Sequence, residues 1–141
     1  MAQNLKKFRE IVFQLLYSRD FEKSDEDVIA SLMMRQHVVP QKLIREAKEK
    51  AGSIWEKRLE LDEKINSSST AFDFEKISRV ELAILRLGYF ELLHTDLPGK
   101  VAIAEAVRLT RKFGTKESAN FINALLDKVY HEQISEEPAT V

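Results

Sequence analysis

The chain has 141 residues, of which 44% are hydrophobic and 32% charged, and its formal net charge is −1 at pH 7. This length suits one compact domain, and the charge balance excludes a general attraction to nucleic acid or anionic lipid, so any phosphate-binding site must be a local patch. The absence of cysteine excludes disulfides and thiolate zinc sites, and four glycines with three prolines are too few for the turns of an all-β protein, which leaves an all-α fold.

The first predicted helix covers residues 5–17 and follows an N-terminus without the apolar run of a signal peptide. Wound at about 100° per residue, it carries an apolar stripe, made of Leu5, Phe8, Val12, Leu15 and Leu16. The opposite side is predicted to carry Lys6, Lys7, Glu10, Gln14 and Tyr17. Arg9 lies at the boundary, and Phe13 lies off the stripe, where we expect it to be exposed.

The middle of the chain predicts two or three further helices. Ser24 is a typical N-cap for a short helix through Met34. Pro40 starts another, which Gly52 is expected to bend or end, and apolar residues continue among charges to position 65. Residues 66–70, Asn-Ser-Ser-Ser-Thr, are predicted to form a polar loop. This loop is the expected junction between subdomains of about residues 1–66 and 71–132.

The second half has the strongest helix signals. Residues 80–93 are apolar on almost every side, which predicts a helix at the centre of a bundle. Pro98 opens the next helix, Gly114 is expected to end it, and Thr115 to cap the last one. Residues 1–132 thus predict one domain of about seven helices, followed by a flexible acidic tail at 133–141. No stretch reaches the about 18 apolar residues of a membrane span, so we expect a cytoplasmic protein.

The sequence offers no grouping of residues for catalysis, metal binding or a cofactor. The three histidines, His37, His94 and His131, are scattered and have no second ligand at helical spacing. Phosphate loops of the GxxxxGK[ST] type and dinucleotide-binding GxGxxG turns are both missing. We therefore expect a binding protein rather than an enzyme.

Charge is distributed unevenly along this nearly neutral chain. Residues 1–19 hold four basic side chains against one acidic one, and residues 100–116 hold five against one. Composition alone slightly favours ordinary solvated helix faces for both segments. Tyr17 shifts the balance toward nucleic acid, because it projects from the same face as Lys6 and an aromatic ring beside cations can stack an unpaired base.

Three ordered blocks of the sequence resemble the NusB family of transcription antitermination factors. The first helix contains an R-E-x-x-x-Q-x-L-Y pattern, made by Arg9, Glu10, Gln14, Leu16 and Tyr17. The central helix matches V-x-x-A-I-L-R-L-x-x-Y/F-E-L from Val80 to Leu92, and the third block matches P-x-K-V-A-I-x-E-A-V-x-L from Pro98. That block continues with K-F-G and S-x-x-F-x-N-x-x-L-D-K, ending at Lys128. The chain departs from the family pattern at Phe13, Ala104 and Ala124, and its N-terminal cluster is based on lysine rather than arginine.

The resemblance implies a fold of two packed three-helix subdomains and an activity without turnover. A member of this family pairs with the ribosomal protein NusE and binds boxA-type single-stranded RNA, notably on ribosomal RNA operons, as part of the RNA polymerase antitermination complex. A homodimer of the free chain is compatible with it.

Site residues follow from the resemblance by position. The implied RNA contacts are Lys6, Lys7, Arg9 and Tyr17 on the first helix and Glu117, Asn120 and Phe121 on the last. The implied contacts with the protein partner are Glu75, Arg79 and Glu81. Structural roles compete, since Phe121 suits a core equally well and Glu117 suits the first turn of its helix. Arg86 and Glu105 are expected to form buried pairs instead.

Two other functions stay open at this point. A similar helical domain occurs in some ribosomal RNA cytosine methyltransferases, but the chain has no strand-turn-helix for their cofactor. The second open function is that of a helical bundle that binds another protein without contacting RNA. It is suggested by the expected exposure of Phe13 and by the modest basic cluster.

Overall fold

The computed structural model describes residues 2–20, 39–68 and 74–134, and these ranges hold six α-helices. They are α1 (Ala2–Arg19), α3 (Gln41–Glu56), α4 (Arg58–Ser68), α5 (Arg79–His94), α6 (Gly99–Phe113) and α7 (Lys116–Val129). A 3-10 turn, η1 (Phe74–Lys76), precedes α5, and a π-helical turn, η2 (Tyr130–Ile134), follows α7. The all-α prediction is confirmed, while the helix predicted from Ser24 to Met34 and residues 135–141 of the predicted tail lie outside the described residues.

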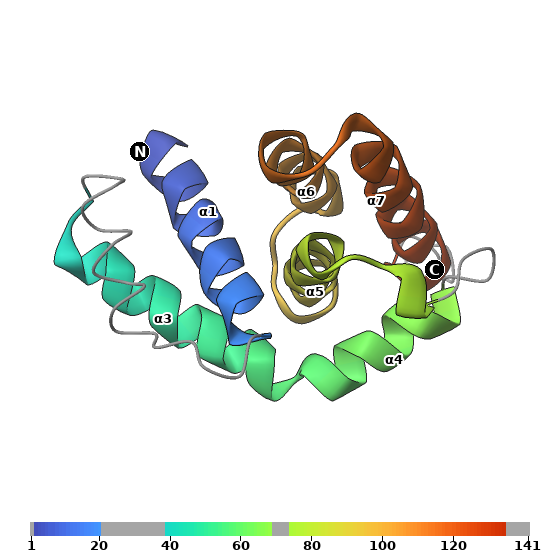
Figure 1. Ribbon diagram of the computed structural model, residues 1–141, viewed down its shortest axis with the longest axis horizontal. Helices are drawn as coiled ribbons and strands as arrows, with labels where there is room; N and C mark the ends of the chain where they lie inside the picture. The colour runs from blue at the N-terminus through green and yellow to red at the C-terminus, as the bar shows by residue number, and fades with distance from the viewer. Residues whose placement is uncertain (1, 21–38, 69–73, 135–141) are drawn as a thin grey trace, which may run out of the picture. The chain divides into compact units, whose positions relative to one another are not determined.

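The chain divides into two compact units, Met1–Lys57 and Arg58–Val141. In the first unit α1 packs along α3, and the second unit contains α4 to α7 (Figure 1). The division precedes α4, whereas the predicted junction at residues 66–70 follows it. Within the described ranges no helix is long and apolar enough to cross a membrane.

Residues 66–68 correct the predicted polar loop, because α4 continues through Ser68. The Ser67 and Ser68 hydroxyls donate to the carbonyl oxygen of Lys64, at 3.0 and 2.8 Å. Serine is neutral in a helix when its hydroxyl bonds back to the preceding turn. Ser68 is also 6% exposed, so packing holds this end of the helix in place.

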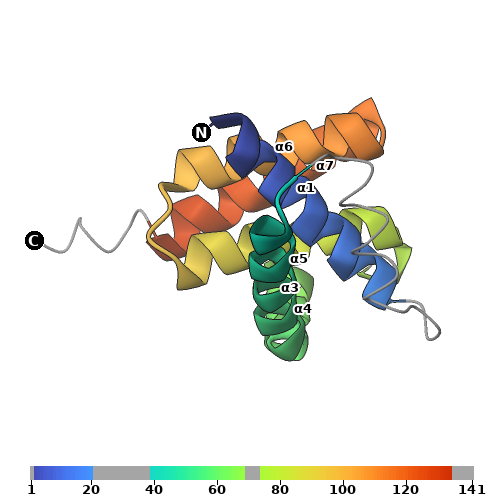
Figure 2. The ribbon, with the colours of Figure 1, turned by 90° about the vertical axis from the view of Figure 1, so that its left-hand side faces the viewer.

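Helix α5 forms the core of the second unit, as its sequence predicts. It contacts α4, α6 and α7, and Figure 2 shows α5, α6 and α7 lengthwise beside one another. Its buried residues are Ala83, Ile84, Leu85, Arg86, Leu87, Gly88, Tyr89, Glu91 and Leu92. A side chain at Gly88 would lie 3.1 Å from Leu126, so glycine here allows α5 and α7 to approach closely.

The predicted pairing of Arg86 is confirmed. Its Nε and Nη2 atoms donate to the two carboxylate oxygens of Asp62, at 2.8 and 2.7 Å, and this bidentate pair joins α5 to α4. The Arg86 side chain is only 6% exposed and that of Asp62 20%. Glu105 also pairs, accepting hydrogen bonds from Arg108 on the next turn of α6 at 3.2 and 3.3 Å, but both side chains are half-buried rather than buried.

Helix α1 is buried on more sides than its amphipathic pattern predicts. Glu10, predicted on the polar side, is 4% exposed, and Phe13, predicted to be exposed, is 3% exposed. Leu5, predicted on the apolar stripe, is 58% exposed. Residues 10–13 are buried in succession, and four consecutive residues point around the whole circumference of a helix. An amphipathic pattern predicts one buried side, so the prediction is wrong at this turn, where the helix is buried all round.

The helix ends in the second half confirm their capping signals. Gly114 is the C-cap of α6, and its N–H donates to the carbonyl oxygen of Thr110 at 2.7 Å. The Thr115 hydroxyl accepts from the N–H of Ser118 at 3.0 Å and caps α7. Gly52 does not end its helix, since α3 continues to Glu56.

Candidate nucleic-acid and partner interfaces

The predicted RNA contacts of the first unit lie along α1, and we call Lys6, Lys7, Arg9 and Tyr17 the α1 basic strip. Lys6 is exposed, and Lys7, Arg9 and Tyr17 are half-buried. At about 100° per residue, Lys6 and Tyr17 project from the same side of the helix. The strip therefore combines cationic groups with an accessible aromatic ring on one helix.

Phe13 supports the ring of Tyr17 from within the first unit. The two rings are stacked with their centroids 6.1 Å apart and their planes at 27°. Because Phe13 is buried while Tyr17 is half-buried, the pair holds the tyrosine in one orientation at the surface. This contact gives Phe13 a role that helical periodicity did not predict.

Two cation–π contacts fasten α1 to α3 beside this strip. The Lys50 ammonium lies 5.8 Å from the centroid of the Phe8 ring, and the Arg19 guanidinium 5.8 Å from that of Trp55. Each such contact contributes about 0.5–1 kcal/mol at an exposed site. These contacts join α1 to α3 at Phe8 and at the C-terminal residue of α1.

The predicted contacts of the second unit lie on the first turns of α7. Glu117 and Asn120 are exposed, and Phe121 is half-buried. Thr115, not Glu117, supplies the capping hydrogen bond, so the carboxylate of Glu117 only adds a charge near the positive end of the helix.

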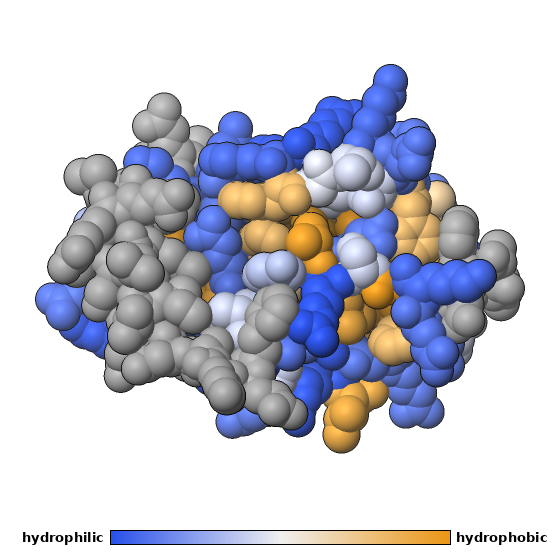
Figure 3. Space-filling view, in the orientation of Figure 1, coloured by the Kyte–Doolittle hydropathy of each residue, from blue (hydrophilic) through white to orange (hydrophobic). Residues whose placement is uncertain are grey.

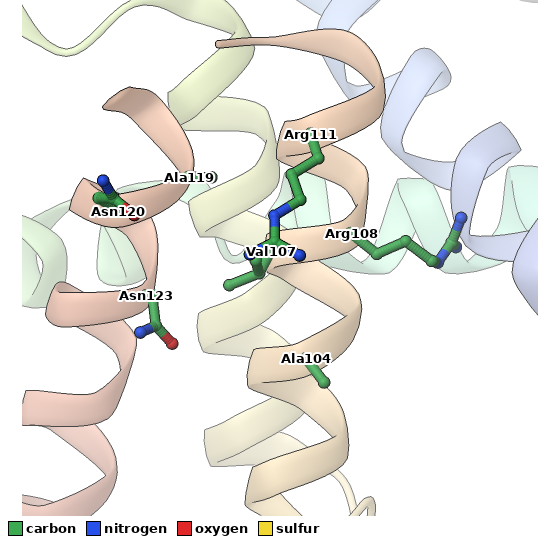
Figure 4. Close-up of a pocket in the computed structure, with 7 residues that line it drawn as sticks. All are labelled: Ala104, Val107, Arg108, Arg111, Ala119, Asn120 and Asn123. Carbon is green, nitrogen blue, oxygen red and sulfur yellow. The ribbon is translucent and has the colours of Figure 1, made fainter. Parts of the chain in front are cut away.

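Asn120 also lines a cavity of about 360 Å³ between α6 and α7. The residues that line it are Ala104, Val107, Arg108, Arg111, Ala119, Asn120 and Asn123 (Figure 4). Glu117 and Phe121 are not among them. Sequence reasoning did not single out Arg111 or Asn123, although the spacing of Arg108 with Arg111 and of Asn120 with Asn123 places each pair on one helix face.

Comparison with known proteins identifies the family. The family model described as "NusB family" matches residues 6–131. The chain belongs to the NusB family. It is 38% identical to the transcription antitermination protein NusB of Chlamydia pneumoniae over 88% of this chain and 78% of that protein. This family consists of transcription antitermination factors, and the chain is not an enzyme.

Solved NusB structures share the fold. The NusB of T. maritima is 25% identical, with a TM-score of 0.76 over 96% of both chains. A second similar chain, 22% identical with a TM-score of 0.75 over 93% of this chain and 98% of that one, comes from a crystal structure of antitermination factors NusB and NusE in complex with dsRNA. Both the α1 basic strip and the residues of α7 lie inside the segment that the NusB family model matches.

The predicted partner contacts of this NusB-family chain cluster at the start of α5. Glu75 in η1 and Arg79 at the first position of α5 are exposed, and Glu81 is half-buried. The Ser78 hydroxyl accepts from the N–H of Glu81 at 3.1 Å, and the Glu81 carboxylate accepts from the N–H of Ser78 at 2.9 Å. This capping box gives Glu81 a structural role beside any role in binding.

Apolar side chains reach the surface near these charges. Phe74, Ile77 and Val80 are half-buried around the same helix start. Figure 3 shows hydrophobic surface over the region of α5 and α6, bordered by hydrophilic side chains. Apolar surface with a charged border is typical of protein-binding sites.

Proposed function

We propose that this chain is a transcription antitermination factor that binds boxA-type single-stranded RNA together with the ribosomal protein NusE, notably on ribosomal RNA operons. The observation that carries the proposal is the α1 basic strip, where Phe13 stacks against the partly exposed ring of Tyr17 on the helix that carries Lys6. Membership of the NusB family supports the proposal. We expect such a protein to act in the cytoplasm with RNA polymerase.

The mechanism is binding without turnover. Lys6, Lys7 and Arg9 neutralise phosphates, and Tyr17 stacks on an unpaired base. Lysine makes a point-charge contact where arginine forks and stacks, so the strip contributes affinity more than sequence selectivity. The competing function is that of a protein-interaction bundle without RNA contact. One of the two observations that favoured it, the expected exposure of Phe13, is wrong, because Phe13 is buried.

Replacing both Lys6 and Lys7 with alanine should weaken binding to all RNAs alike. Each lost phosphate contact on a single strand lowers the salt slope of the binding constant by about 0.7, so the double variant should lower it by about 1.4. Tyr17→Ala should cost about 1–3 kcal/mol and leave the slope nearly unchanged, because it removes a stacked base rather than a charge. Titrations at several salt concentrations with NusE present measure both effects.

A matched control for these lysines is Lys42→Ala, an exposed lysine of α3 outside the strip. Lys42→Ala should lower the affinity for RNA less than the replacement of Lys6 and Lys7 does. Wild-type affinity in both the double lysine variant and Tyr17→Ala would remove α1 from the RNA site.

We further propose that Glu75, Arg79 and Glu81 face NusE, with the half-buried apolar residues around them. Glu81→Gln keeps an oxygen that accepts from the N–H of Ser78, so the capping box survives while the charge is lost. If Glu81 meets a cation on NusE, this variant should weaken the complex by about 0.2–1 kcal/mol. Glu81→Lys should weaken it further, because like charges then face one another.

Titration calorimetry with NusE measures both Glu81 variants, and thermal unfolding reports whether the fold is kept. An affinity for NusE unchanged in Glu81→Gln would leave Glu81 with its capping role alone.

A further inference from the structure

The α6–α7 cavity contains polar groups that the fold itself does not use. Arg111, Asn120 and Asn123 are exposed and make no hydrogen bond or ion pair with the part of the chain that the structure describes. Arg108 differs from them, because Glu105 accepts two hydrogen bonds from its guanidinium. One cation and two amides are thus available at this cavity.

The view in Figure 4 shows how these groups are arranged. Arg111 folds back over Val107 on α6, and Asn123 projects from α7 toward α6, while Arg108 extends away from this group. The remaining lining residues, Ala104, Val107 and Ala119, are small and apolar. The cavity therefore has apolar walls with amides on one side and a guanidinium on the other.

This combination is complementary to a nucleotide. An asparagine amide carries both a donor and an acceptor, which matches the edge of a heterocyclic base. A guanidinium stacks on the face of a base and also forks to a phosphate. Binding cavities for small ligands span about 300–1,000 Å³, and a volume of about 360 Å³ is at the lower end, which suits a single base with its phosphate.

We propose that the α6–α7 cavity receives one unpaired nucleotide of the bound RNA. Asn120 and Asn123 bond to the edge of its base, and Arg111 contacts the base face or the adjoining phosphate. This inference rests on the proposed function, since it names a base-reading subsite for the same RNA. It also supplies the selectivity that a lysine-based strip lacks, because edge contacts distinguish bases whereas phosphate contacts do not.

The test combines cavity variants with base removal in the RNA. The full chain with NusE is titrated against a fluorescein-labelled boxA oligoribonucleotide, and against versions in which one nucleotide at a time is abasic. In the wild type, loss of the base that fills the cavity should weaken binding about 5- to 150-fold. With Asn120→Ala and Asn123→Ala combined, the intact RNA should bind more weakly and that abasic position should have no further effect. Every other position should keep its effect.

Asn66→Ala is the matched control, because Asn66 is an exposed helical asparagine outside the cavity, and it should behave as the wild type. Identical abasic profiles in the wild type and the cavity variant, with normal wild-type affinity, overturn the inference and leave the proposed function intact. Loss of NusE binding without RNA in the cavity variant overturns it as well, since the cavity then takes a protein group. If the wild type with NusE binds no RNA, the proposed function and the inference both fail.

Discussion

Replacing Asp62 with alanine should lower the free energy of unfolding by about 3–5 kcal/mol. The substitution removes the two Asp62 oxygens that accept from Arg86, at 2.8 and 2.7 Å, from beside a guanidinium whose side chain is 6% exposed. A buried charge without its counter-ion costs far more than the intact pair contributes. Denaturant unfolding measures the loss.

Two further variants test whether the loss comes from the burial of the charge rather than from the loss of an ion pair as such. Glu46→Ala removes the acidic partner of Lys42 in a pair whose side chains are 81% and 51% exposed, and it should cost less than about 1 kcal/mol. Combining Asp62→Ala with Arg86→Met should recover much of the lost stability, because neither charge is then buried. If Asp62→Ala alone is as stable as Glu46→Ala, the pair between Asp62 and Arg86 contributes little to the free energy of unfolding.

The free energy of unfolding should fall by about 2 kcal/mol as the pH rises from about 10 to 12, because the pKa of Tyr89 is higher in the folded than in the unfolded chain. Tyr89 is fully buried, and its hydroxyl has no hydrogen-bond partner within the described residues. The pKa of Tyr89 is raised to about 12, chiefly by burial, with Ser68 acting to lower it and the charge of Glu132 to raise it. The Ser68 hydroxyl itself donates to Lys64 at 2.8 Å, so its offset is partial.

The sign follows from proton binding. Between about pH 10 and 12 the unfolded chain releases the tyrosine proton while the folded chain keeps it, so a rising pH favours unfolding. Tyr89→Phe removes this loss and should be at least as stable as the wild type at pH 8, since it deletes a buried hydroxyl without a partner. The measurement is the difference in unfolding free energy between the two proteins at pH 8 and 11. A difference that does not change with pH would contradict the raised pKa.

Much of the fold follows from local signals in the sequence. Residues 80–93 are apolar around the helix, and α5 is buried accordingly. Gly114 and Thr115 carry their own capping chemistry, so the boundary between α6 and α7 was predictable to the residue. These features depend on neighbouring residues, which a sequence displays directly.

Several features that depend on distant residues were not predictable. The burial of Glu10 and Phe13 reflects what surrounds α1, and residues 66–68 stay helical because Ser68 is packed. Arg111 and Asn123 belong to separate helices, and only the packing of α6 on α7 brings them to one cavity. The capping box of Ser78 and Glu81 is a local feature that was predictable from the spacing of the two residues. Glu81 was instead predicted only as a partner contact, from the family resemblance.

The most direct test of the central claim is the affinity of this chain for boxA RNA, measured by titration with and without NusE at several salt concentrations. We expect weak binding by the isolated chain and binding about 5- to 150-fold tighter with NusE, which corresponds to a coupling of about 1–3 kcal/mol. We also expect a salt slope that falls in the double lysine variant. A chain that binds NusE tightly but binds no RNA at any salt concentration, with or without that partner, would contradict the account.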